Sequence, residues 1–130
     1  MGLEFFASDV ETDVASYWSD ERCQDVHELY VNFVVGPEEP GHGLYLWREY
    51  NASGGPGRFA AEPMVAYTDR EPTSGILQVH LTRGQIRVAL RKREEVTARF
   101  NLEEEEFERI RTSLQELFAD RSEYSERLER

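Results

Sequence analysis

Two alternating runs joined by a two-residue link constrain the fold of this chain more than any other feature. The runs are "ILQVHLT" (residues 76–82) and "QIRVALR" (residues 85–91). Their apolar side chains fall on alternate positions: Leu77, Val79, Leu81, Ile86, Val88 and Leu90. A period of two places side chains on one face of a strand, and the link Arg83-Gly84 suits a tight antiparallel turn. The sequence therefore predicts a β-hairpin with one buried face.

Further alternating segments flank this hairpin. They are "ELYVNFVV" (28–35), "GLYLWREY" (43–50), "MVAYTD" (64–69) and "EVTARF" (95–100). The residues expected to point inward are Leu29, Val31, Phe33, Val35, Leu44, Leu46, Val96, Ala98 and Phe100. Segments rich in glycine and proline, 36–43 and 51–63, separate three of the strands and read as loops. We expect an antiparallel meander.

The period changes to that of a helix after residue 100. Apolar residues recur at helical spacing at Phe107, Ile110, Leu114, Leu117 and Phe118. Asn101 is the expected N-cap, with Glu104 as its capping-box partner, and the run Glu103 to Glu106 suits the positive end of the helix dipole. The polar tail from about residue 119 is expected to fray or to extend the helix weakly.

These patterns predict an α+β fold, in which a curved antiparallel sheet carries the C-terminal helix packed across one face. A chain of 130 residues is most simply one domain, residues 1–130. The formal net charge of -11 argues against a nucleic-acid partner, because nucleic-acid binding needs a basic face.

The location expected from the sequence is the cytoplasm. Cys23 is the single cysteine and cannot form an internal disulfide, which suits a reducing compartment. The opening "MGLEFFASDVETDV" lacks the basic start of a signal peptide. No apolar run approaches the length of a membrane helix, so no membrane partner is expected.

Signals for catalysis or metal binding are weak. Cys23 and His27 have helical spacing, but their surroundings are acidic and lack an apolar stripe. The three histidines show no metal-binding spacing, and the glycine-rich loop "ASGGPGRFA" lacks the Lys-Ser/Thr of a phosphate-binding loop. We expect no catalytic residue, no metal and no cofactor, and hence a protein that is not an enzyme.

Charge is distributed unevenly along the chain. Residues 1–47 hold ten acids and one base, whereas residues 48–99 hold six acids and nine bases. The candidate partner-binding residues come from the acidic segment and its two aromatics: Asp9, Glu11, Asp13, Tyr17, Trp18, Asp20, Glu21 and Asp25. Aromatics anchor protein contacts, and carboxylates steer and pair with cationic partners. The alternative is a solvated acidic face with both aromatics packed inward.

Two other functions remain open at this stage. A small anionic ligand, or the substrate of an enzyme, could bind an arginine-lined sheet face that includes His80. The arginines are Arg48, Arg58, Arg70 and Arg87. A homodimer could also form through an exposed sheet edge. For a protein partner, the glycine-rich loop 51–63 is a second candidate interface beside the acidic segment.

The order of these segments resembles the immunity protein 10 family of bacterial polymorphic toxin systems. The likeness covers residues 43–118 and consists of hydrophobic spacings. It includes the strand with Leu44, Leu46, Trp47 and Arg48, the strand 64–69 with the turn Ser74-Gly75, the hairpin with Val79, Leu81, Ile86, Val88 and Leu90, and the acid-rich helix with Glu103 to Glu106 that ends at Leu117-Phe118. The resemblance implies a small cytoplasmic protein that binds and neutralises a cognate toxin, such as a basic nuclease.

Overall fold

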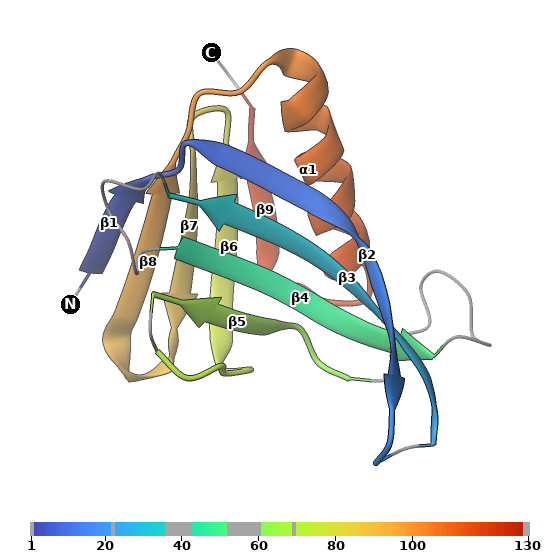
Figure 1. Ribbon diagram of the computed structural model, residues 1–130. Coiled ribbons are helices and arrows are strands. Elements are labelled where there is room, and N and C mark those ends of the chain that lie inside the picture. Colours follow the sequence, from blue (N-terminus) through green and yellow to red (C-terminus); the bar gives the residue numbers. More distant parts are fainter. Residues whose placement is uncertain (1, 22, 36–42, 52–60, 69, 129–130) are drawn as a thin grey trace.

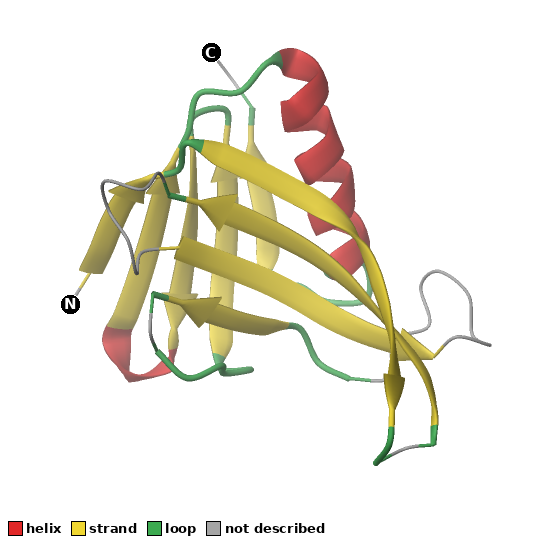
Figure 2. Cartoon of the chain, viewed as in Figure 1, coloured by secondary structure: helices red, strands yellow, loops and turns green. Residues whose placement is uncertain are grey.

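The chain folds into two β-sheets and a helix. The computed structural model describes residues 2–21, 23–35, 43–51, 61–68 and 70–128. Within these ranges lie the strands and helix β1 (Gly2–Phe6), β2 (Asp9–Ser19), β3 (Gln24–Val34), β4 (Gly43–Asn51), β5 (Met64–Tyr67), β6 (Ile76–Thr82), β7 (Gln85–Leu90), β8 (Glu94–Arg99), α1 (Glu104–Leu117) and β9 (Tyr124–Arg127) (Figure 1, Figure 2). A short 3₁₀ turn, η1 (Arg91–Arg93), links β7 to β8. The α+β class is confirmed.

The strands divide between two sheets. The five-stranded sheet has the order β1-β8-β7-β6-β9, and the four-stranded sheet has the order β2-β3-β4-β5. The meander expected from the sequence supplies the antiparallel neighbours β3, β4 and β5 in one sheet and β6, β7 and β8 in the other. Strands β1 and β9 pair in parallel with β8 and β6. The apolar face of each sheet is buried against that of the other. A single open sheet with one helix would leave part of its apolar face exposed.

The two inward faces and the helix share one core. Its fully buried members include Val31 and Leu46 of the four-stranded sheet and Leu81 and Val88 of the five-stranded sheet. Helix α1 lies along the side between β2 and β9 (Figure 1). The apolar stripe predicted for the helix is buried in this core: Phe107, Ile110, Leu114, Leu117 and Phe118. The helix therefore covers the opening between the two sheets.

The start of α1 differs from the prediction. The N-cap is Glu103 rather than Asn101, and its side chain makes no capping hydrogen bond. Glu104, Glu105 and Glu106 occupy the first turn, where the helix dipole favours negative charge. The guanidinium of Arg83 donates to Glu104 at 2.9 Å. An ion pair from the β6–β7 hairpin thus anchors the helix start in place of a side-chain cap.

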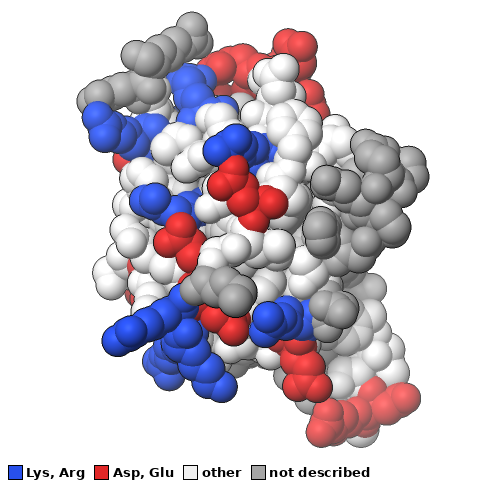
Figure 3. Space-filling model, turned by 90° about the vertical axis from the view of Figure 1, so that its left-hand side faces the viewer, with Lys and Arg blue, Asp and Glu red and all other residues white. Residues whose placement is uncertain are grey.

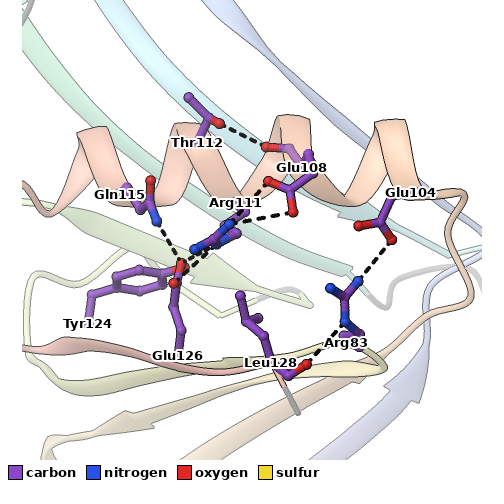
Figure 4. A network of polar contacts seen from close by, with 9 residues as sticks. All are labelled: Arg83, Glu104, Glu108, Arg111, Thr112, Gln115, Tyr124, Glu126 and Leu128. Carbon is purple, nitrogen blue, oxygen red and sulfur yellow. Dashed lines mark hydrogen bonds and ion pairs between the residues drawn. The ribbon is translucent and has the colours of Figure 1, made fainter. Parts of the chain in front are cut away.

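The tail beyond residue 119 is ordered by pairing, so the expectation that it frays is wrong over its described part. Strand β9 aligns Tyr124 with Val79 of β6. Figure 4 shows the polar network that joins β9 to α1. Arg111 Nε lies 3.1 Å from both carboxylate oxygens of Glu126, which also accepts hydrogen bonds from Gln115 and the Tyr124 hydroxyl. The polar residues of the tail meet the polar side of the helix.

One residue predicted to point inward does not. Leu77 is 57% exposed, whereas Ile76 beside it is buried. The β6–β7 pairing shifts register between Ile76 and Gln78, so a β-bulge reverses the alternation at this point. The remaining inward positions predicted for this hairpin are buried: Val79, Leu81, Ile86, Val88 and Leu90.

A buried arginine connects β4 to the C-terminal end of α1. Arg48 continues the inward row of β4 and is 4% exposed. Its guanidinium donates to the Leu117 carbonyl at 2.9 Å and to both carboxylate oxygens of Asp120 at 2.6 and 3.0 Å. A cation is favourable at a helix C-terminus, and the last turn of α1 contains no base of its own. Arg48 therefore stabilises the fold.

Strands β2 and β3 form a long hairpin that projects from the molecule. Each has eleven residues, and they pair along their whole length. The end of this hairpin extends beyond the other strands at the lower right of Figure 1. We call its outer part, residues 14–28, the arm. The sequence predicted no strand before residue 28, so β2 and the start of β3 were missed.

Candidate functional site

The outer face of the four-stranded sheet carries acidic and aromatic side chains in rows across the strands. Asp13, Tyr30 and Trp47 are neighbours across β2, β3 and β4. Glu28 and Glu49 form the next row on the same face. The described residues of this face include neither lysine nor arginine. The face therefore presents negative charge around an aromatic centre.

The aromatic centre is held by contacts between tilted rings and by a hydrogen bond. The Tyr45 ring lies 5.5 Å from the Tyr30 ring and 5.1 Å from the Trp47 ring, measured between centroids. The Tyr45 hydroxyl donates to the Glu28 carboxylate at 2.8 Å. Burial and this carboxylate raise the pKa of Tyr45, so its hydroxyl remains a neutral donor. These contacts fix the apolar surface that a partner would meet.

An acidic groove runs between β2 and the start of α1. It has a volume of about 340 Å³. Its lining consists of Asp9, Val10, Glu11, Thr12, Asp13, Tyr30, Glu106 and Arg109. Four carboxylates against one guanidinium give the groove a negative potential. The fold thus brings three of the predicted partner-binding acids together and adds Glu106 from the helix.

Two of these acids also protect a sheet edge. The carboxylates of Asp9 and Asp13 accept hydrogen bonds from the backbone N–H groups of Val10 and Val14, at 2.9 and 2.8 Å. Strand β2 is the edge of its sheet, and an edge with unengaged donors can pair with another chain. A homodimer formed by adding a strand along β2 would have to displace these carboxylates.

The two aromatics of the arm are exposed, so the alternative in which they pack inward is wrong. Tyr17 is 44% exposed and Trp18 is 59% exposed. As consecutive residues of β2 they point to opposite faces of the hairpin. The Tyr17 hydroxyl donates to Glu49 at 3.0 Å, and Trp18 Nε1 donates to Asp20 at 3.0 Å. The arm therefore offers one aromatic contact on each side.

No cation in the described part of the chain neutralises the predicted acids. Asp9, Glu11, Asp13, Asp20, Glu21 and Asp25 are exposed. None of the six forms an ion pair with a described residue. Their charges are available to a cationic partner. The acids fall into two groups, three along the groove and three at the tip of the arm.

Cys23 and His27 do not meet as a helical pair. Cys23 lies in the turn of the arm with φ 52°, and its thiol is directed at the Asp20 carbonyl, 3.4 Å away. His27 lies in β3, where its Nδ1 is 2.6 Å from the Ser16 hydroxyl. Because both residues belong to a β-hairpin and not to a helix, their i, i+4 spacing does not bring the two side chains together as a dyad.

Of the four arginines proposed as an anion site, the three that the structure describes are not brought together. Arg48 points inward and binds Asp120, whereas Arg87 is exposed on the other sheet beside His80. Arg70 lies beyond the end of β5 and contacts Glu94 at 3.4 Å. Arg58, with residues 52–60 of the glycine-rich loop, lies outside the described residues.

The described part of the chain carries no sign of a metal site or a membrane-spanning helix. No group of three or more His, Cys, Asp or Glu side chains there could hold a metal ion. None of its helices is long and apolar enough to cross a membrane. Comparison with protein-family models, with curated proteins and with solved structures finds no match to this chain.

Some residues of the candidate surface were not singled out from the sequence. They are Glu28, Tyr30, Tyr45, Trp47, Glu49 and Glu106. The alternation in residues 43–50 places Tyr45 and Trp47 on the strand face away from the buried leucines, and this pattern could have identified them as surface residues. Their proximity to Asp13 depends on the β2–β3 register, which a single sequence does not reveal.

Proposed function

We propose that this protein binds a cationic protein in a stoichiometric complex and neutralises it, as an immunity protein neutralises its cognate toxin. The observation that supports this best is the set of six exposed acids without a described cationic partner, next to two exposed aromatics on one projecting hairpin. Carboxylates attract lysine and arginine, and aromatic side chains supply contact energy at the centre of an interface. The resemblance to immunity proteins points to the same function.

The shape of the arm suggests how neutralisation would work. Tyr17 and Trp18 face opposite sides, so a partner that encloses the arm would contact both. A narrow hairpin with acids at its tip suits insertion into a basic cleft, such as the active site of a nuclease. The outer sheet face and the acidic groove would supply further contacts. Occlusion of this kind needs a complementary surface and no catalytic group.

The direct test is to express the protein together with the toxin encoded beside its gene. We expect growth to be rescued and the two proteins to elute as one complex in size-exclusion chromatography. The association rate should fall as salt is raised, because surface charges steer the encounter. Continued killing of the host together with no co-purification would overturn the proposal.

Substitutions on the arm test which surface carries the interaction. Trp18→Ala and Tyr17→Ala should each weaken toxin binding by about 30-fold or more, the loss expected for an aromatic at the centre of an interface. Phe6→Ala is the matched control, since Phe6 is 54% exposed on β1 in the other sheet. Isothermal titration calorimetry measures all three. Equal losses in the control and the arm variants would contradict the assignment of the arm.

A further inference from the structure

A basic cavity lies on a different part of the molecule from the arm. It forms where the segment after β5 meets the η1 turn, and it has a volume of about 340 Å³. Its lining residues are Tyr67, Arg70, Glu71, Thr73, Ser74, Gly75, Leu90, Arg91, Lys92 and Glu94. Figure 3 views the side of the molecule on which η1 lies and shows lysine and arginine side chains gathered on its lower part.

The positive charge of this cavity is not cancelled by its acids. Glu94 accepts a hydrogen bond from the Tyr67 hydroxyl and contacts Arg70 at 3.4 Å. Arg91 and Lys92 form no ion pair with any described residue. Two cations without a described acidic partner thus lie beside a cavity, in a chain with a net charge of -11.

The backbone of the η1 turn is unfavourable for the residues it contains. Lys92 and Arg93 have φ values of 69° and 59°, in the left-handed region that glycine and asparagine occupy more readily. Each costs about 1–2 kcal/mol in this conformation. The pairing of Leu90 with Glu94 holds the turn in place. Two cations therefore occupy positions whose backbone conformation favours glycine, which suggests that their charges have a function.

We propose that this cavity binds a phosphate-bearing small molecule. Arg91, Lys92 and Arg70 would supply charged donors to the phosphate, and the Ser74 hydroxyl a neutral one. The Tyr67 ring and Leu90 would form the apolar wall for the rest of the molecule. The volume lies within the range of small-molecule pockets, about 300–1,000 Å³. The site is independent of the toxin-neutralising function, because none of its residues belongs to the arm or to the acidic groove.

Titration of the ¹⁵N-labelled protein, followed by NMR, tests the proposal. The probes are inorganic phosphate, pyrophosphate and adenosine monophosphate, and the last of these tests whether the apolar wall contributes. We expect saturable shifts confined to the amides around Gly75, Arg91 and Lys92. Arg91→Gln and Lys92→Asn should each weaken binding of the best probe by about tenfold, the effect of one charge-assisted hydrogen bond. Asparagine tolerates the left-handed backbone, so the second variant keeps the turn.

Arg87→Gln is the matched control, because Arg87 is an exposed cation on β7 outside the cavity lining. It should leave the affinity for the probe unchanged. Equal weakening by Arg87→Gln would mean diffuse attraction to positive charge and would overturn the site, as would shifts that do not saturate. Trp18→Ala should also leave probe binding intact. Failure of toxin binding with retained phosphate binding would refute only the proposed function.

Discussion

The two sheets of this protein differ in how their charged side chains are used. On the five-stranded side, Arg83 binds Glu104 and Arg111 binds Glu126, so charges at the surface hold elements together. Along β2 of the four-stranded sheet, the acidic side chains have no described cationic partners. Adjacent like charges destabilise a folded chain. The first arrangement stabilises the fold, whereas the second is the surface that the proposed binding of a cationic partner would use.

The strands of the two sheets also differ in length. Those of the five-stranded sheet have four to seven residues and end with the core. Strands β2 and β3 have eleven residues each and continue beyond it. The additional length exposes Tyr17 and Trp18 and buries little. If this comparison is right, substitutions should separate stability from binding, and the following five experiments test the stability side of that separation.

The largest loss of stability should come from the core of the five-stranded sheet. Leu81→Ala removes a fully buried side chain of β6 and should lower the free energy of unfolding by about 2–5 kcal/mol. Leu77→Ala on the same strand is the matched control, because Leu77 is 57% exposed. It should change stability by less than about 1 kcal/mol. Urea denaturation measures both, and equal effects would contradict the bulge in β6.

Replacing the buried arginine should have an intermediate effect. Arg48→Met leaves the Leu117 carbonyl without its charged donor and should cost about 1–3 kcal/mol. Asp120 becomes unpaired but is 61% exposed, so water can solvate its charge. Chemical denaturation near neutral pH gives the value. No loss of stability would mean that the connection between β4 and α1 is dispensable.

The same ion pair makes stability depend on pH. Hydrogen bonding to Arg48 lowers the pKa of Asp120 below its ordinary value. The folded protein therefore holds this proton less tightly than the unfolded chain does. The ion pair between Asp120 and Arg48 contributes fully to stability above about pH 5, and this contribution is lost as the pH falls below about 4. In Arg48→Met this part of the acid sensitivity should disappear, which denaturation midpoints measured across that range would reveal.

On the arm, the effect on stability should be small. Trp18→Ala should lower the free energy of unfolding by about 1 kcal/mol or less, because the side chain is largely exposed. Trp47→Ala is the comparison within the same sheet, since Trp47 packs against Tyr45 and should cost more. Thermal unfolding measures the pair. A cost for Trp18 as large as that for Trp47 would show that the arm supports the fold.

The smallest expected effect is a gain in stability at the turn of the arm. Cys23 has φ 52°, and glycine adopts this conformation without a steric penalty. Cys23→Gly should raise stability by about 0.5 kcal/mol, the relief of strain less the entropy that glycine loses on folding. Cys23→Ala retains the Cβ atom and should give no gain. Denaturant midpoints of the two variants, compared with the parent, decide the point.

The sequence predicted those parts of the fold in which side-chain alternation reports burial. The hairpin at Arg83-Gly84, the inward rows of β3, β4 and β8, and the helical stripe from Phe107 to Phe118 are all confirmed. Strand β9 was missed because it is short and polar, and neither its backbone pairing with β6 nor its polar contacts with α1 leave a periodic apolar signal. The bulge that turns Leu77 outward was missed because it depends on pairing with β7.

The candidate site was predicted by composition rather than by geometry. The acids and aromatics of residues 9–25 were selected for their type; they are exposed, and their role in binding stays a prediction. Their division into a groove and a tip follows from the β2–β3 hairpin, which the sequence did not reveal. The contribution of Glu106 depends on the packing of α1 beside β2, a contact between segments far apart in the chain.

The parallel pairing of β1 with β8 has a consequence for the order of assembly during synthesis. Gly2 lies opposite Glu95, so β1 leaves the ribosome long before β8, the strand with which it pairs. The β2–β3 hairpin needs only its own short turn and can form early. At about 5–20 residues per second, several seconds separate the two events. We expect the arm to be formed on the nascent chain while β1 is still unpaired. We also expect the slow parallel pairing of β1 with β8 to limit the rate of folding.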